Sequence, residues 1–524
     1  MADENNAVFP VVIIGAGLAG LAAGAHLAGR GIAPALIEAD SLWPGGRLSG
    51  GEVDTFVYDG QTWSFESEHG VHALWGDYNN MRALIQQFTP TILQPSSGEE
   101  WINRWGREVR RIEAGNAIRS RWIPAPFHYL QLLFHPQIWA NIQPWDFLSL
   151  PGFLFSIFLT LGIDPIREKR AWDGLYLKDF FYLWTPNLRT TFEGLATNLL
   201  AAPGEQITLT GLIAALRFYT MLRRDSWHLS YLPTSAHTSI VQPLVEFIEA
   251  HEGGIYNGVS AQRLEREDGY WRIIVEDSQR GGIRSLLAEQ VILALDAPGA
   301  ARLLQNSPQL ASEAHQMIFP QGVGNATVRL WFSCAPREGV MGGMMTGDFT
   351  PDNFFWVHRI YEDCRQWHET TGGGIIELHY YAAAYLDLPE RNLIIESVTE
   401  VQRAFPELKG SFVYGAVRKN SKVHTSFRVP TEETLHVQTP WQDLYACGDW
   451  IGYDTPSMWM ERSTTTAIAA ANAIIAAYDG EIYPILQPQP PELLARILSI
   501  LLRSMRQLLT PLTYLFRKSR GSAG

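Results

Sequence analysis

A glycine-rich turn between an apolar strand and a helix constrains this chain more than any other feature. Residues 11–14 read VVII, and a GxGxxG spacing follows them at the start of an alanine-rich run, residues 18–28. A second expected strand, residues 33–40, carries Glu38 near its end. In this order backbone amides and a helix N-terminus can face a pyrophosphate, and Glu38 can accept from a ribose hydroxyl. The predicted dinucleotide contacts are Gly15, Ala16, Gly17, Leu18, Ala19, Gly20, Glu38 and Ala39.

Two further short motifs contain residues that could contact the same dinucleotide. Residues 45–47 read GGR and follow Glu38 within one loop, where an arginine beside a close backbone approach can clamp the same pyrophosphate. A glycine turn with a solvated arginine is the alternative. Far along the chain, residues 448–449 read GD and close a strand ahead of a helix expected to begin near residue 457.

Together these segments resemble the flavin amine oxidase and carotenoid desaturase superfamily, through its GGR motif, its terminal GD motif and a PxxxMExA-type segment at residues 456–462. The resemblance implies FAD as cofactor, with Asp449 on a ribityl hydroxyl and Met460 beside the isoalloxazine. Ala261 stands where the superfamily often has a valine at the adenine end. The FAD contacts implied here are Gly46, Arg47, Ala261, Gly448, Asp449 and Met460.

The length of 524 residues predicts more than one packed domain. The expected fold class is α/β: a Rossmann-like FAD-binding domain of the GR2 type built from discontinuous segments, a mixed α+β substrate domain and a C-terminal amphipathic helix. Strands of the substrate domain are expected at WFSC, FFWVHRI and GGIIELHYYA. The predicted boundaries are 9–87, 237–297 and 439–480 for the FAD-binding domain, 88–236 and 298–438 for the substrate-binding domain, and 481–524 for a linker and the C-terminal helix.

One segment favours carotenoids within this superfamily. Residues 67–75, SEHGVHALW, and 77–82, DYNNMR, resemble the EHGFHGFF and QYYNLR stretch of carotenoid desaturases of the isorenieratene-synthase branch, the carotene desaturase/methylase group. The departures from that pattern are Val71, Ala73 and Leu74. His69 and His72 are the candidate catalytic residues, as proton acceptors with a suitable ordinary pKa. Two core histidines with satisfied hydrogen bonds are the alternative.

The resemblance implies a desaturase acting on a lipophilic polyene or isoprenoid. A hydride would pass from a carbon next to the polyene to flavin N5, and a neighbouring proton would then be lost. In a β-ionone ring, aromatisation would also need one methyl group to shift to the adjacent cationic carbon, with no external methyl donor. The sequence has no second GxGxxG and no Cys/His pattern for an attached Rieske centre, so the expected electron acceptor is a quinone, oxygen or a separate carrier.

Two other functions stay open at this point. A flavin amine oxidase or a protoporphyrinogen-oxidase-like enzyme would share the fold and the cofactor motifs. A prenyl-lipid carrier without redox activity could also use this architecture, although a carrier has no need of a complete flavin cradle.

Composition narrows the partners. The formal charge of −13 argues against a nucleic acid, and three distant cysteines, Cys334, Cys364 and Cys447, predict neither a disulfide framework nor a four-cysteine metal site. No metal is expected. The acidic N-terminus lacks the pattern of a signal peptide, so a cytoplasmic location is expected.

Two segments predict contact with a membrane surface. Residues 147–163 are apolar but short for a span and contain Pro151, which favours a buried or membrane-dipping segment. Residues 493–516 have leucines at helical spacing with Arg496, Arg503 and Arg506 on other faces, as in a helix lying in the membrane plane. Docking of that helix on the protein itself is the alternative. The aromatic residues expected to supply cavity walls are Trp122, Phe127, Tyr129, Phe134, Trp139, Trp145, Phe153, Phe155 and Phe158.

Overall fold

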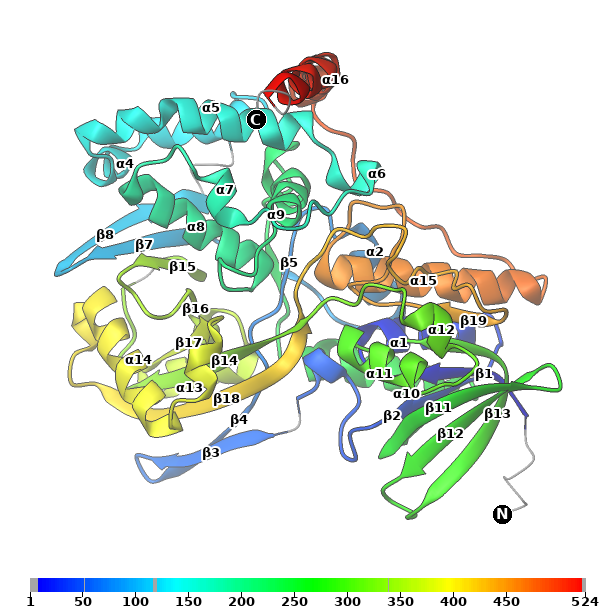
Figure 1. The fold of residues 1–524 in the computed structure, drawn as a ribbon. Coiled ribbons are helices and arrows are strands. Elements are labelled where there is room, and N and C mark those ends of the chain that lie inside the picture. The colour runs from blue at the N-terminus through cyan, green and yellow to red at the C-terminus, as the bar shows by residue number, and fades with distance from the viewer. Residues whose placement is uncertain (1–7, 51, 116–119, 338, 521–524) are drawn as a thin grey trace.

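Two seven-stranded sheets and the helices around them make up the protein (Figure 1). The structure, a computed structural model, describes residues 8–50, 52–115, 120–337 and 339–520. The first sheet has a parallel part, in the order β10-β2-β1-β13, and β19 pairs with the end of β13. β12 and β11 extend it as antiparallel strands. The bounds are β1 Val8–Ile14, β2 Pro34–Glu38, β10 Gly254–Asn257, β11 Val259–Glu267, β12 Tyr270–Asp277, β13 Ile283–Leu293 and β19 Leu444–Ala446.

This sheet confirms the predicted α/β class with a Rossmann-like unit assembled from distant segments, because its strands come from the beginning, the middle and the end of the chain. Its buried parallel strands are continuous apolar runs, as strands covered on both faces should be. The domain boundaries given above stay a prediction.

The second sheet is mixed, in the order β18-β14-β17-β16-β15-β7-β8, with β15 and β7 parallel. Its strands are β7 Glu99–Trp105, β8 Glu108–Glu113, β14 Gly322–Phe332, β15 Gly342–Gly347, β16 Asn353–Phe355, β17 Gly374–Tyr380 and β18 Phe412–Thr425. Of the three predicted strands, FFWVHRI is mostly wrong: β16 ends at Phe355 and a 3-10 turn, Val357–Arg359, follows. The apolar residues Trp356 and Val357 pack in the core but do not continue the strand, and their hydropathy alone suggested a strand.

Small strands and short helical turns connect the sheets. β3 (Val53–Tyr58) pairs with β4 (Gln61–Glu66), while β9 (Ser230–Tyr231) lies between β5 (Ala73–Leu74) and β6 (Gln94–Pro95). Helical turns of the 3-10 or π type are η3 Phe127–Phe134, η4 Pro144–Ser149, η5 Arg217–Met221 and η6 His237–Val241.

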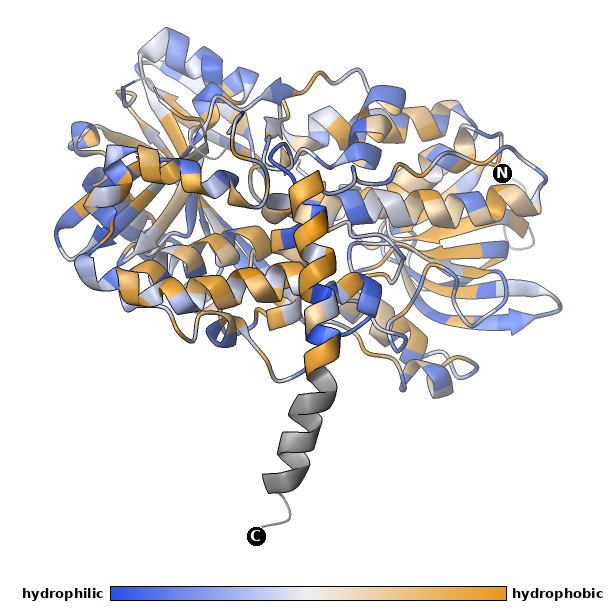
Figure 2. Ribbon diagram, turned by 90° about the horizontal axis from the view of Figure 1, so that it is seen from above, coloured by the Kyte–Doolittle hydropathy of each residue, from blue (hydrophilic) through white to orange (hydrophobic). Residues whose placement is uncertain are grey.

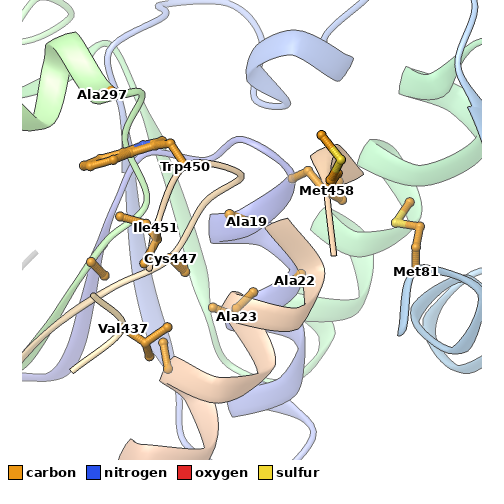
Figure 3. Packing of buried hydrophobic residues seen from close by; sticks show 14 of the residues in the cluster. Ala19, Ala22, Ala23, Met81, Ala297, Val437, Cys447, Trp450, Ile451 and Met458 are labelled. Atoms are coloured by element: carbon orange, nitrogen blue, oxygen red, sulfur yellow. The ribbon is translucent and has the colours of Figure 1, made fainter. Parts of the chain in front are cut away.

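Helices α1 (Leu18–Ala28) and α15 (Trp459–Ala477) pack against each other beside the first sheet. The short side chains of Ala19, Ala22 and Ala23 lie at this crossing (Figure 3), which lets the two backbones approach closely. The remaining helices are α2 Asn79–Phe88, α4 Pro136–Asn141, α5 Leu150–Gly162, α6 Pro165–Glu168, α7 Leu177–Phe180, α8 Pro186–Leu200, α9 Leu209–Leu216, α10 Gln242–Ala250, α11 Ala297–Gln305, α12 Ala311–Ala314, α13 Glu362–Thr371, α14 Glu390–Ala404 and α16 Leu493–Arg520.

Helix α16 packs on α5 at one face of the molecule (Figure 2). Arg503 and Arg506 make ion pairs with Asp164, at 3.4 Å, and with Glu168, at 2.6 Å. The docked-helix alternative therefore holds for this side of α16. We expected Pro151 to interrupt the apolar segment, but it does not break a helix. It lies in the first turn of α5, where its missing N–H has no helical partner to lose.

Candidate functional site: a cofactor cradle continuous with an apolar cavity

The predicted cofactor residues lie at the carboxyl ends of the parallel strands, and we call the surface that they form the cradle. β1 ends at Ile14, β2 at Glu38 and β13 at Leu293, and the three strands are in register with one another. The turns that follow them therefore emerge at one edge of the sheet, which is where open α/β folds bind nucleotides. The structure describes a cavity of about 970 Å³ along this edge.

Most of the predicted cofactor residues line this cavity. They are Gly15, Gly17, Leu18, Ala19, Glu38, Ala39, Gly46, Arg47, Ala261, Gly448, Asp449 and Met460. The two others are not part of the lining: Ala16 is fully buried and donates its N–H to Glu38 Oε2 at 2.9 Å, and Gly20 lies in the first turn of α1.

Gly20 is required by a close approach. A Cβ at this position would lie 2.0 Å from the carbonyl oxygen of Gly15, so any side chain would push α1 away from the turn. Within the described chain no side chain caps the start of α1, and its first turn holds no acidic residue. The free N–H groups there face the cavity and form a site for an anion such as a phosphate.

The GGR loop joins the cradle through backbone and charge. Gly45 N–H donates to the carbonyl oxygen of Ala16 at 2.8 Å, which places the loop directly against the first glycine turn. Arg47 Nη2 lies 2.8 Å from Asp449 Oδ2. The guanidinium is about one-third exposed and the carboxylate is buried, and both residues line the cavity, so Asp449 holds the cation at the cavity wall.

The start of α15 is held by an unusual buried cation. Arg462 is fully buried, and its guanidinium donates to the carbonyl oxygens of Ile451, Tyr453, Thr455 and Ser457. Burial lowers the pKa of Arg462 to about 10, which still leaves the side chain charged at neutral pH. It fixes the loop between β19 and α15, and with it Met460, whose side chain lines the cavity.

The same cavity continues between the second sheet and the layer of short helices. There the wall is mainly apolar and aromatic, with Trp75, Trp101, Leu195, Leu199, Trp227, Tyr231, Phe355 and Trp459. The polar side chains on this part are His69, His72, Glu99, Asn198, Asn353, His379, Tyr381 and His424. An elongated apolar molecule could thus lie against a cofactor in the cradle.

None of the nine aromatic residues expected to form cavity walls lines the cavity. Several lie at the surface instead: Trp122, Phe134, Trp139, Trp145 and Phe155 are exposed. The expectation was wrong because an aromatic-rich composition fits a cavity wall and an apolar outer face equally well.

His69 and His72 both line the cavity. Burial lowers the pKa of His69, and it lowers the pKa of His72 to about 3, so both imidazoles are neutral at physiological pH. His72 Nδ1 lies 3.9 Å from Glu68 Oε1, beyond hydrogen-bond distance. Glu68 is itself fully buried, and burial raises its pKa to about 7.

His379 and Tyr381 were missed by the sequence reasoning, as was Glu377 behind them. The signal was present in the expected strand GGIIELHYYA, where two ionisable residues two positions apart share one face of an otherwise apolar strand. No cluster of three or more metal-ligating side chains occurs in the described ranges.

Comparison with known proteins agrees with this geometry. A family model described as "NAD(P)-binding Rossmann-like domain" matches residues 13–88, and one described as "Flavin containing amine oxidoreductase" matches residues 168–475. The chain is similar to a carotenoid phi-ring synthase of Streptomyces griseus, 24% identical over 89% of this chain and 87% of the relative. It is also similar to a 15-cis-phytoene desaturase of Synechococcus elongatus, 21% identical over 90% and 96% of the two chains. Among solved structures, cyclohexylamine oxidase from Brevibacterium oxydans shares the fold, with a TM-score of 0.63 at 13% identity over 90% of this chain and all of that one.

Proposed function

The chain belongs to the flavin-containing amine oxidoreductase family, and from that premise we propose that it is an FAD-dependent carotenoid desaturase, in the form that aromatises an end ring. The observation that carries the proposal is the continuity of the cofactor cradle with a large cavity walled by aromatic and aliphatic side chains. The similarity to a carotenoid phi-ring synthase over most of both chains supports the same substrate class.

FAD is the cofactor, and the residues of the cradle fit it. The free N–H groups of α1 and the Arg47 guanidinium suit the pyrophosphate, Glu38 suits a ribose, and Asp449 suits the ribityl chain. When bound, FAD supplies a two-electron acceptor that takes a hydride at N5. We assign the individual contacts, including Ala261 and Met460, as part of the proposal.

The chain's own residues would bind the polyene, orient it and accept a proton. The aromatic wall excludes water and offers ring faces to a conjugated cation. His69, His72 and His379 all line the cavity, and the proton acceptor is one of these histidines; His69 and His72, the two named from the sequence, are neutral at physiological pH.

We further propose a peripheral membrane location on the cytoplasmic side, with a quinone, oxygen or a separate carrier as electron acceptor. The support is a set of exposed apolar side chains on η3, η4, α4, α5 and α16, here called the apolar face; α4, α5 and α16 lie along one side of the molecule (Figure 1). Its exposed members include Leu133, Phe134, Trp139, Trp145, Phe147, Leu148, Leu150, Leu154, Phe155, Leu493, Ile497, Ile500, Leu501 and Leu508. Such an area is large for a protein surface in water and typical of a membrane-binding surface.

By length and composition, Pro144–Gly162 is the one helix in the described ranges that could cross a membrane, and 39% of its apolar window is buried in the protein. A helix with part of its surface packed on the protein and part exposed fits lying on a bilayer better than spanning one. A polyene leaving that bilayer would meet the protein on this side.

The test is anaerobic. Purified flavoprotein in lipid vesicles is mixed with a panel of carotenoids and with amines, and the oxidised flavin band and the polyene absorption are followed together. Bleaching of the flavin with formation of a longer or aromatic chromophore supports the proposal. Bleaching by an amine alone would assign the chain to amine oxidation, and a protein that binds carotenoid but holds no flavin would assign it to lipid carriage.

A further inference from the structure

Four polar side chains of the second sheet form a connected row that ends at the cavity. Arg329 Nη2 donates to Glu377 Oε2 at 2.8 Å, and Glu377 Oε1 lies 3.0 Å from His379 Nε2. His379 Nδ1 lies 3.4 Å from Tyr381 Oη, which accepts from Asn353 Nδ2 at 2.9 Å. We call Arg329, Glu377, His379 and Tyr381 the relay. The last two line the cavity, and the first two are buried behind them.

The sheet itself sets the order of the relay. Arg329 on β14 lies directly opposite Glu377 on β17, and His379 follows two positions later on the same face of β17. The placement of Arg329, Glu377 and His379 is therefore built into strand register, and Tyr381 follows directly after the end of β17.

The segment that contains His69 and His72 rests on the relay. Val71 N–H donates to Glu377 Oε1 at 2.8 Å. Gly70 has a φ of 144°, and a Cβ there would lie 2.9 Å from Cε1 of His379. A glycine is needed at position 70 because the backbone passes directly over the His379 ring.

The ionised Glu377 determines which nitrogen of the neutral His379 ring carries the proton. Burial opposes ionisation of Glu377, but the charge of Arg329 and the hydrogen bond from His379 outweigh it and lower the pKa of Glu377 to about 2. An ionised Glu377 only accepts hydrogen bonds, so His379 Nε2 carries a proton in the neutral ring. The lone pair is then on Nδ1, on the side of Tyr381.

His69 and His72 lack this support. Within the described chain neither ring has an ionised carboxylate at hydrogen-bond distance, and burial lowers the pKa of both. A proton placed on either ring would be a buried charge that no hydrogen-bonded carboxylate stabilises, which is unfavourable.

We propose that His379 Nδ1 accepts the proton that the substrate loses, with Glu377 and Arg329 as positioning residues. The inference rests on the proposed function. One C–H bond of the substrate breaks and its electron pair leaves with the hydride to the FAD that the family holds. The neighbouring C–H bond then breaks, its electron pair forms the new C=C bond, and its proton goes to Nδ1. Glu377 stabilises the resulting imidazolium.

The first test does not need turnover. Histidine labelled with ¹³C at Cε1 is titrated by NMR in the flavin-loaded protein, and the His379 signal is assigned by its loss in His379→Gln. The groups that face His379 are Glu377, Tyr381, Asp352 and His72, with Arg329 behind Glu377. Glu377→Gln should move the His379 titration at least one pH unit lower, because the anionic partner is lost. Glu400→Gln, which alters a buried carboxylate paired with Arg104, should leave it unchanged.

The second test is the rate of flavin reduction by a carotenoid. His379→Gln should slow it by 100-fold or more while flavin content and carotenoid binding stay within twofold, and His69→Gln and His72→Gln should cost less than tenfold. The rate of flavin reduction should rise with pH as His379 loses its proton. In Glu377→Gln this rise should occur at lower pH. Glu377→Asp, which keeps the charge, should leave the His379 titration close to that of the wild type, and if Glu377→Gln does not fold, the rate measured for His379→Gln decides the proposal.

The outcomes separate the two proposals. If no carotenoid bleaches the wild-type flavin, the proposed function fails, and the NMR titration still decides whether Glu377 controls His379. If the wild type is active but the rate of flavin reduction in His379→Gln is within tenfold of the wild-type rate, the relay is overturned. It is also overturned if the His379 titration does not move in Glu377→Gln.

Discussion

Arg47 Nη2 lies 2.8 Å from Asp449 Oδ2, and this ion pair joins the loop after β2 to the end of β19. The two residues come from opposite ends of the chain and meet because β2 and β19 end at the same edge of one sheet. Both residues line the cavity, and the guanidinium is the more exposed of the two, so it is the partner better placed to meet a phosphate.

Arg47→Met should weaken FAD binding without unfolding the protein. Hydrogen bonds to charged groups contribute roughly 1.5–3 kcal/mol, so the affinity should fall by roughly 10- to 150-fold. The flavin-to-protein ratio after dialysis and titration of the apoprotein with FAD measure the change. Arg110→Met removes a surface ion pair with Glu108 on β8 and is the matched control. Equal flavin retention in both variants would contradict the assignment of Arg47.

Gly20→Ala should separate α1 from the first glycine turn. Its Cβ would overlap the carbonyl oxygen of Gly15 at 2.0 Å, and overpacking of this kind costs roughly 1–3 kcal/mol. We expect a lower melting temperature together with loss of flavin. Gly162→Ala is the control, since a Cβ there meets Leu502 at an ordinary 3.5 Å. The contact argument is wrong if the two variants melt at the same temperature.

The cradle was predictable from the sequence because its signals are local. A turn that needs glycine, a helix start without a cap and an acidic residue at a strand end each leave a mark within a few residues. The strand and helix around Gly15 were correctly placed, and 12 of the 14 predicted cofactor residues line the cavity. Their roles as FAD contacts stay a prediction.

The substrate side was not predictable in the same way. The relay joins β14, β17 and the segment around Gly70, and which ionisable residues meet depends on strand register in a mixed sheet. The exposed Trp145 and Phe155 illustrate the second difficulty, because hydropathy alone does not tell an apolar surface from an apolar interior.

Charges on the apolar face should release the protein from vesicles. Leu148→Asp and Leu154→Asp change side chains that are 74% and 58% exposed, so folding should be unaffected. Burial of a leucine side chain contributes roughly 1.5–3 kcal/mol, which predicts at least about a tenfold weaker partition for each variant. Flotation with vesicles of neutral and anionic lipid measures it. Ile395→Asp alters an exposed residue of α14, outside the apolar face, and should bind like the wild type. Equal binding of all four proteins would exclude this face as the membrane contact.

A buried histidine outside the site should make stability depend on pH. His26 in α1 packs between the rings of Phe88 and Tyr483, and burial lowers its pKa from 6.5 to about 4. The unfolded chain therefore binds a proton at a pH where the folded protein does not. The free energy of unfolding therefore has its full value above pH 6.5 and falls as the pH is lowered towards 4. At pH 5 the decrease is about 2 kcal/mol.

His26→Gln removes this titration. We expect the variant to melt below the wild type at pH 7.5 because packing is lost, and we expect the gap to narrow or reverse at pH 5, where the wild type must exclude a proton from His26. Melting curves of the flavin-loaded proteins give the gap in melting temperature between wild type and variant at each pH. Comparing the gap at pH 7.5 with the gap at pH 5 cancels the loss of packing, which is the same at both. His315→Gln changes an exposed histidine on the surface and should melt with the wild type at both values. A gap for His26→Gln that is the same at pH 5 and pH 7.5 would show that His26 does not titrate in this range.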